Sequence, residues 1–180
     1  MANRFAERLG RLHELMDQKE LAGLLAYGNQ FRKDHLRYVA PFPTPSPYGF
    51  CLLTKTSGDL FVEEPWNETT PPETVQAVHG ARSPRAVARL VGETIRKQDL
   101  GPRIGLVGHD VLEVGLLDEV KAAAGSVEFV PATKDVAEIR LVKDAEELAA
   151  YRRGAEFADR GYEAFVKACR PGRKQYEVVA

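Results

Sequence analysis

Short apolar runs of strand length alternate with helix-like segments along most of the chain, and this alternation restricts the fold more than any other feature. Three such runs are LAGLLAYG (residues 21–28), RIGLVG (103–108) and VEFVPA (127–132). Apolar residues at helical spacing in the segments between and before them predict amphipathic helices. Strands that alternate with helices in this way predict an α/β domain whose layers pack around a sheet.

An antiparallel hairpin should make that sheet mixed. In YGFCLLTKTSGDLFVEE (48–64), the apolar strand 49–54 and the return strand 60–64 flank the turn KTSGD. TVQAV (74–78) is a further short strand candidate. The preceding segment APFPTPSPYG (40–49) carries four prolines, which fix φ and remove backbone donors, so we expect irregular loop there.

Local capping chemistry predicts where several helices begin and end. Ser83 followed by Pro84 is the expected start of a helix, because serine caps the free N–H groups and proline needs no donor in the first turn. Asp110, with Glu113 three residues later, predicts the start of a second helix that ends at Gly125. A short helix is expected near residues 30–38.

The final helix is long and has one continuous apolar stripe. Asp144 and Glu147 form a capping-box pair at its start. The stripe comprises Leu148, Tyr151, Ala155, Ala158, Tyr162, Phe165 and Cys169. We expect this stripe to pack into a second domain, which makes Leu148, Tyr151, Tyr162 and Phe165 interface candidates. The alternative is that the helix covers the first domain or swaps into a partner chain.

Composition excludes several classes of protein. The net charge is -1, and a nucleic-acid-binding protein usually carries a basic excess. We therefore expect no nucleic-acid partner, and no apolar stretch is long enough for a membrane span. The charged N-terminus does not resemble a signal peptide. Cys51 and Cys169 both lie on apolar patterns, so we expect two buried thiols and a cytoplasmic location.

Metal-binding and nucleotide-binding patterns are incomplete. The four histidines (His13, His35, His79 and His109) show no metal-ligand spacing, so we expect no metal site and no cofactor in this chain. GLVGHD (105–110) follows a strand, but it has only Gly105 and Gly108 of the three glycines that a dinucleotide fingerprint needs. A strand that ends in a tight turn explains this segment.

Several stretches resemble the creatinase/aminopeptidase P/prolidase family of pita-bread metallohydrolases. They are RLGRLHELMDQKELAGLLAYG, RIGLVG and, above all, AEIRLVKDAEELAAYRRGAEFADRGYEAF with RPGRKQYEVVA. The resemblance implies a three-layer α/β/α N-terminal domain with a ribonuclease H-like mixed sheet over residues 1–132. A junction at 133–143 would follow, and 144–180 would be the first helix and the start of the second helix of a truncated catalytic domain.

The same resemblance implies chemistry outside this sequence. The family uses two divalent metal ions, which for the parent enzyme would be manganese, cobalt or zinc, held by Asp, His and Glu ligands that none of these residues match. The implied parent is an Xaa-Pro dipeptidase or aminopeptidase that acts on a small peptide or amide. This chain would be its non-catalytic N-terminal domain, contributing to a homodimer and to substrate access. The alternative is a free-standing α/β binding or interaction module.

Charge, aromatic rings and loop sequence converge only between residues 32 and 48. The family resemblance implies that this segment reaches across a dimer toward the partner's active site. His35, Arg37, Tyr38 and Tyr48 are therefore substrate-access candidates, and a surface loop with local ion pairs is the alternative. Creatinase has an arginine in the comparable loop that has no counterpart in RYVAPFPTPSPYG. Trp66, in a polar loop, is a further interface candidate or a local packing residue.

Overall fold

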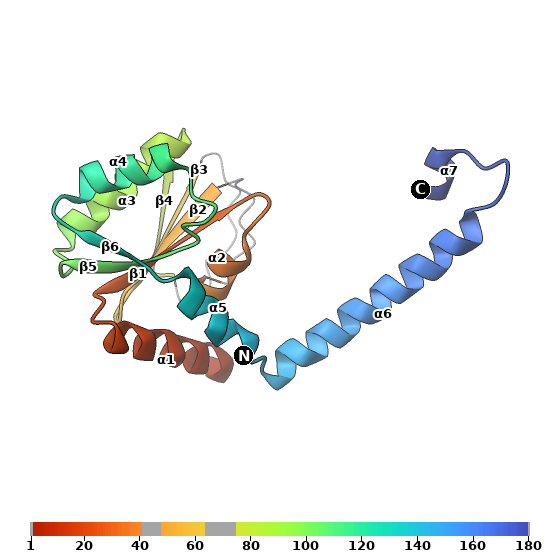
Figure 1. Cartoon of the computed structure of the whole chain (residues 1–180), viewed down its shortest axis with the longest axis horizontal. Coiled ribbons are helices and arrows are strands. Elements are labelled where there is room, and N and C mark those ends of the chain that lie inside the picture. Colours follow the sequence, from red (N-terminus) through yellow and green to blue (C-terminus); the bar gives the residue numbers. More distant parts are fainter. Residues whose placement is uncertain (1, 41–47, 64–74, 180) are drawn as a thin grey trace. The chain divides into compact units, whose positions relative to one another are not determined.

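The computed structural model describes residues 2–40, 48–63 and 75–179, and the chain divides into two compact units, Met1–Arg140 and Leu141–Ala180. Each unit is described by itself. Within the described residues of the first unit, six strands form one sheet in the order β4-β3-β2-β1-β5-β6 (Figure 1). The strands are β1 Gly23–Asn29, β2 Tyr48–Leu53, β3 Gly58–Glu63, β4 Ala77–Ala81, β5 Arg103–Val107 and β6 Glu128–Pro131.

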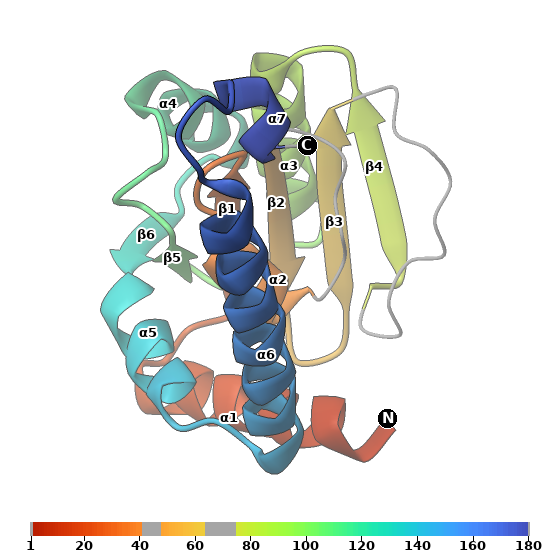
Figure 2. The same ribbon diagram turned by 90° about the vertical axis from the view of Figure 1, so that its right-hand side faces the viewer.

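The sheet is mixed, as predicted. The β2–β3 pair and the β1–β2 pair are antiparallel, whereas β3–β4, β1–β5 and β5–β6 are parallel. Figure 2 shows β2 and β3 side by side, with β4 at the edge of the sheet. The position of β4 differs from the predicted strand at residues 74–78. It begins at Ala77, where parallel pairing with Asp59 of β3 sets its register.

Helices cover both faces of the sheet and complete the predicted α/β/α layers. One face carries α1 (Ala2–Gln18), α2 (Asp34–Val39) and α5 (Thr133–Leu141), and the other carries α3 (Pro84–Lys97) and α4 (Val114–Ala124). Successive residues of β1 point to opposite faces, as the pleat requires. Leu24 and Ala26 join the α1–α2–α5 cluster, and Leu25 and Tyr27 join the α3–α4 cluster.

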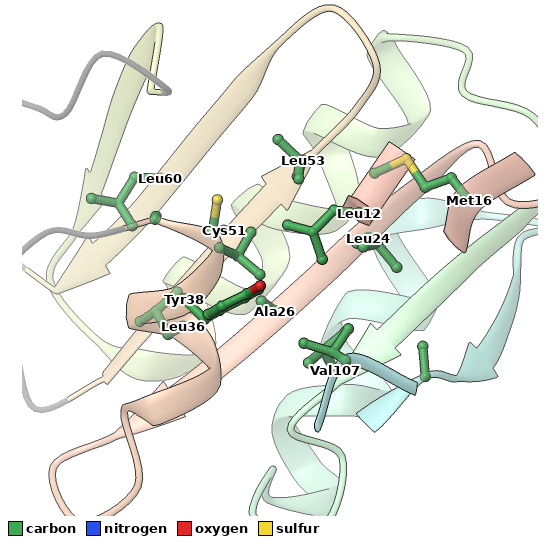
Figure 3. Close-up of a cluster of buried hydrophobic side chains, with 14 of the residues drawn as sticks. Leu12, Met16, Leu24, Ala26, Leu36, Tyr38, Cys51, Leu53, Leu60 and Val107 are labelled. Atoms are coloured by element: carbon green, nitrogen blue, oxygen red, sulfur yellow. The ribbon is translucent and has the colours of Figure 1, made fainter. Parts of the chain in front are cut away.

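Figure 3 shows the first of these clusters, in which Leu12 and Met16 of α1 lie over Leu24 of β1. Leu12, Met16 and Leu24 are fully buried. Burial of a side chain of this size contributes about 2–3 kcal/mol before entropy is counted. Cys51 lies in the same cluster and is buried, as the sequence predicted.

The capping predictions have mixed outcomes. The Ser83 hydroxyl accepts a hydrogen bond from the Ala86 N–H at 3.3 Å, and α3 begins at Pro84. Gly125 follows α4 with a φ of 83°. Asp110 does not cap α4, because the described helix begins only at Val114, after Glu113, and Asp110 bonds to a distant arginine instead. The short helix α2 begins at Asp34 rather than near residue 30.

The second unit contains the predicted long helix, α6 (Ala145–Ala168), and the short α7 (Gln175–Val179). The Glu147 N–H donates to Asp144 Oδ1 at 2.7 Å, and the Asp144 N–H donates to Glu147 Oε2 at 3.0 Å, so the capping box is confirmed. None of the side chains that the structure describes in α6 is buried. Cys169 is exposed, which corrects the prediction that it is buried.

Candidate functional site

The candidate site lies beyond the carboxyl ends of β1 and β5. The chain leaves β1 toward α2 on one face of the sheet, and it leaves β5 toward α4 on the other face. A crevice forms where neighbouring parallel strands send their connections to opposite faces, and ligands of open α/β sheets bind in such places. Four charged side chains from three chain segments meet here: Arg32, Asp34, Asp110 and Arg140.

Tight turns at the two strand ends bring these side chains together. After β1, the Asn29 side chain accepts hydrogen bonds from the N–H groups of Phe31 at 3.0 Å and Arg32 at 2.9 Å. This local turn directs the chain back toward α2. After β5, Gly108 has a φ of 83°, and a Cβ there would lie 2.6 Å from the Tyr27 carbonyl oxygen. The tight turn predicted for GLVGHD is therefore present.

Arg32 and Arg140 are linked through one carboxylate. Arg140 Nη1 donates to Asp34 Oδ2 at 2.6 Å, and Arg32 Nε lies 3.6 Å from Asp34 Oδ1. Arg32 Nη2 also donates to Asp110 Oδ2 at 3.3 Å, which joins the segment after β1 to the segment after β5. Partial burial would raise the pKa of Asp34, but the Arg140 hydrogen bond and the His35 and Arg140 charges together hold that pKa below its usual value.

His35 is buried beside this network and is only 5% exposed. Its Nδ1 lies 3.1 Å from Arg140 Nη1, and its Nε2 lies 3.8 Å from Asp34 Oδ2. Burial lowers the pKa of His35, and the charge of Asp34 opposes that effect only in part. Because a guanidinium can only donate, His35 Nδ1 is the acceptor of this contact.

Tyr38 is also buried, and two guanidinium groups lie over its ring. Arg8 Cζ is 4.4 Å from the ring centroid, and Arg140 Cζ is 5.9 Å from it. Arg37, between His35 and Tyr38 in the sequence, is exposed. The three candidates on α2 thus differ: His35 and Tyr38 are part of the domain's packing, and Arg37 presents its side chain to solvent.

The structure separates one further candidate, Tyr48, from this site. Tyr48 starts β2 opposite Asn29, but its side chain packs with the α3–α4 cluster on the other face of the sheet from α2. Trp66 lies outside the described residues. Leu148, Tyr151, Tyr162 and Phe165 are all exposed on α6 in the second unit.

Sequence reasoning missed Arg140 and assigned Asp110 another role. Arg140 is 106 residues from Asp34, so no local spacing connects them. It also missed a second polar cluster between β3, β4 and the end of α3. There His79 Nε2 lies 2.8 Å from Asp59 Oδ1, Gln98 donates to Asp59 Oδ2 at 3.0 Å, and the His79 ring stacks on Phe61.

The described residues do not fit a metal centre. No group of three or more His, Cys, Asp and Glu side chains within residues 2–40, 48–63 and 75–179 is placed to hold an ion. His109 precedes the acidic Asp110 in the sequence, but its Nδ1 contacts Thr133 Oγ1 at 2.6 Å. In the same part of the chain, no helix combines the length and hydrophobicity that crossing a bilayer requires.

Comparisons with known proteins identify related sequences and folds. The sequence model of the Creatinase/Prolidase N-terminal domain matches residues 8–142. A putative dipeptidase, YkvY of Bacillus subtilis, is 29% identical over 91 residues, which are 51% of this chain and 25% of that protein. The chain therefore aligns with only a quarter of this curated relative.

Solved structures show the same fold at low identity. The X-Pro aminopeptidase of Thermotoga maritima matches with a TM-score of 0.76 at 16% identity, over 94% of this chain and 46% of that one. The Xaa-Pro dipeptidase of Bacillus anthracis matches with a TM-score of 0.73 at 22% identity, over 97% and 46%. The N-terminal domain of the cytoplasmic peptidase PepQ from Mycobacterium tuberculosis matches at 0.57 and 20% identity, over 73% and 97%. The family match over most of the first unit, together with this fold, shows that the chain belongs to the creatinase/prolidase N-terminal domain family.

Proposed function

We propose that this chain is the non-catalytic N-terminal domain of a metal-dependent Xaa-Pro dipeptidase or aminopeptidase that acts in the cytoplasm. The observation that carries the proposal is the family match over residues 8–142, on a fold shared with solved Xaa-Pro peptidases. The two divalent metal ions of the whole enzyme, manganese, cobalt or zinc, would activate water for attack on the amide carbonyl. The described residues of this chain offer no ligand cluster for them, so their ligands would belong to another part of the enzyme.

Substrate access is the first role that we propose for the domain, and Arg37 is the residue that would contact the substrate. Arg37 is exposed on α2, whereas His35 and Tyr38 are buried beside it. An exposed guanidinium suits the carboxylate of a small peptide, because its donors match the two oxygens. In this proposal Arg37 contacts substrate in the active site of a partner subunit, and His35 and Tyr38 hold α2 in place. Tyr48 and Trp66 remain proposed contributors to substrate access and to the interface, respectively.

The second proposed role is assembly with the catalytic domain, and the exposed side chains of α6 support this role. Tyr151 is 66% exposed and Tyr162 is 70% exposed, which is unusual for large aromatic side chains on one helix. The matches to the longer Xaa-Pro peptidases cover 94–97% of this chain, whereas the match to the isolated PepQ N-terminal domain covers only 73% of this chain. The additional coverage supports α6 as a part of the catalytic domain, where Leu148, Tyr151, Tyr162 and Phe165 would be buried.

The proposed division of the chain follows from this role. Residues 1–132 form the N-terminal domain, 133–143 the junction, and 144–180 the first helix and the start of the second helix of the catalytic domain. The boundary between the two compact units of the chain, Arg140 to Leu141, falls within the proposed junction. The whole enzyme would be a homodimer, since cross-subunit substrate contact requires two copies.

The experiment that tests the proposal compares two proteins. One is the 180-residue chain, and the other is the product of the same reading frame extended past Ala180. Both are assayed on a panel of Xaa-Pro dipeptides with manganese supplied. Hydrolysis by the longer protein alone is the expected result. Hydrolysis by the 180-residue chain would overturn the non-catalytic role, and an extended frame without Xaa-Pro hydrolysis would overturn the proposed enzyme.

The role of Arg37 needs a matched variant of the longer protein. Arg37→Ala should raise KM for a dipeptide with a free carboxylate, because one charge-assisted contact is lost. Arg82→Ala removes another exposed arginine, away from α2, and should leave KM unchanged. Equal kinetics for Arg37→Ala, Arg82→Ala and the parent protein would refute the substrate contact. Sedimentation analysis of the same samples tests the dimer.

A further inference from the structure

Arg140 is the last residue of the first compact unit, and its side chain reaches back to three residues of α2. It donates to Asp34 Oδ2 at 2.6 Å, approaches His35 Nδ1 at 3.1 Å and lies 5.9 Å from the ring centroid of Tyr38. We propose that Arg140 is a positioning residue that fixes α2 to the end of α5, in part through a contact that only neutral His35 accepts, so that protonation of His35 removes this contact and weakens the attachment of α2.

The helix that this contact holds is short. α2 has six residues, and a helix of that length is not stable without tertiary contacts. Its N-cap residue, Lys33, makes no side-chain capping hydrogen bond to α2 among the described residues. Leu36 and Val39 are buried in the α1–α2–α5 cluster and attach one side of α2 to the sheet. Arg140 adds a polar anchor at the N-terminal end, where Asp34 and His35 lie.

The chemistry of the contact fixes the protonation state of His35. A guanidinium offers N–H groups and no acceptor, so Nδ1 must present its lone pair to Arg140. The ring proton is then on Nε2, which faces Asp34 Oδ2 at 3.8 Å. A second proton on Nδ1 would place an N–H against an N–H, and a positive ring 3.1 Å from a positive guanidinium. The contact and the protonated ring exclude each other.

The charges around His35 are balanced in pairs. Asp34 on α2 and Asp110 after β5 favour the protonated ring, whereas Arg140 on α5 and Arg32 before α2 oppose it. Burial also opposes protonation and is the largest influence, so the pKa of His35 lies below its ordinary value. The contact is therefore intact at neutral pH and opens in acid.

This inference rests on the proposed function only where it concerns Arg37. Because Arg37 is on the same six-residue helix, the Arg140 contact would hold Arg37 where substrate arrives. The contact itself is a property of the 180-residue chain and is tested there, without any hydrolysis assay. Unchanged kinetics in Arg37→Ala would thus overturn the proposed substrate contact of Arg37 and leave the Arg140–His35 contact standing. Failure of the Arg140–His35 contact would likewise leave the proposed substrate contact to its own test.

The first measurement is an NMR titration of the ¹⁵N-labelled chain that follows the ring nitrogens of His35. At neutral pH the expected result is a protonated Nε2 and an unprotonated Nδ1, with a titration midpoint below that of an ordinary histidine. In Arg140→Gln the midpoint should rise, because an opposing charge is gone. Lys134→Gln is the matched control, since it removes a cation from an exposed site on the same helix and should leave the midpoint unchanged. A proton on Nδ1 at neutral pH, or equal midpoints in all three proteins, would overturn the proposal.

The second measurement is amide exchange of α2, corrected for intrinsic rates. In Arg140→Gln the Arg37 and Ala40 amides, which bond to the carbonyls of Lys33 and Leu36, should exchange about fivefold faster at neutral pH, as expected for a partly exposed charged contact. The β1 amides should not change. In the unaltered chain, a smaller loss of protection should appear as His35 becomes protonated, because the Arg140–Asp34 hydrogen bond remains. Equal losses of amide protection in α2 and β1 would contradict a local positioning role. So would protection of α2 that does not change when His35 is protonated.

Discussion

Adding one methyl group at Gly92 should destabilise the domain, although alanine is the better helix former. Gly92 lies in α3 where that helix packs against α4. A Cβ at this position would be 2.6 Å from the Ala123 Cβ and 2.8 Å from the Ala124 N, and it would also meet the Val120 carbonyl oxygen. Ordinary van der Waals contact of a Cβ begins at 3.4 Å. Since two of the three groups are backbone atoms, α4 itself would have to move.

The size of the effect follows from two opposing contributions. Replacing a helical glycine by alanine stabilises a helix by about 1 kcal/mol. Forcing an extra carbon into a closely packed interface costs about 1–3 kcal/mol, and the upper end applies when side-chain rotation cannot relieve the clash. Gly92→Ala should therefore lose about 2 kcal/mol of unfolding free energy. Gly10→Ala, in α1, meets nothing within 4 Å and should gain up to about 1 kcal/mol.

The assay is urea unfolding followed by the NMR amide signals of β1, which report the first compact unit alone. With a slope of about 2 kcal/mol per M, Gly92→Ala should lower the midpoint by about 1 M, and Gly10→Ala should raise it by up to about 0.5 M. The same substitution thus changes stability in opposite directions at two helical sites. A midpoint for Gly92→Ala at or above that of the parent chain would refute the close approach of α3 and α4.

Three further predictions concern single residues. Ser83→Ala removes the cap of α3 and should cost about 1 kcal/mol in urea unfolding. Burial, with the charge of Asp59 in addition, raises the pKa of the Cys51 thiol to about 12, so a thiol reagent at pH 8 should modify the exposed Cys169 at once and Cys51 only after denaturation. Asp34 and His35 both have folded pKa values below their unfolded ones, so the unfolded chain binds more protons; stability should fall as pH drops below about 6.5, and again below about 3.9. His35→Gln should remove the upper step in a pH series of urea midpoints, and Asp34→Asn the lower one.

The parts of the fold that local chemistry determines could be predicted from the sequence. The Ser83 cap and the Asp144–Glu147 capping box each connect residues three apart, so the pattern contains both partners. The strand β1 was also predictable, because helices cover both of its faces and its burial is continuous from Gly23 to Gly28. A strand covered on both sides appears in the sequence as an uninterrupted apolar run.

Asp110 shows where such local patterns fail. An aspartate followed three residues later by Glu113 satisfies the capping-box pattern as well as Asp144 and Glu147 do. In the structure its carboxylate pairs with Arg32, which is 78 residues away in the sequence, and α4 starts further along the chain. Capping a helix and pairing with Arg32 would each give the carboxylate hydrogen-bond donors. Only the tertiary arrangement of β1 and β5 determines which of the two interactions forms.

Helical periodicity could have predicted part of the candidate site, because it assigns the residues of α2 to a buried and an exposed side. Leu36 and Val39 are three apart and fix the buried side, and His35 shares that side as the i−4 neighbour of Val39. Arg37 is then the residue on α2 that faces solvent, which distinguishes it from His35.

Arg140 lies four residues after the buried Val136 and hence on the side of α5 that faces the domain. Periodicity gives the direction of the guanidinium but not its partners. Asp34 and His35 lie more than 100 residues earlier in the sequence, so the contact depends on how the chain folds α5 against α2. The residue that we propose as the anchor of α2 is therefore one whose orientation is a local property and whose role is a tertiary one.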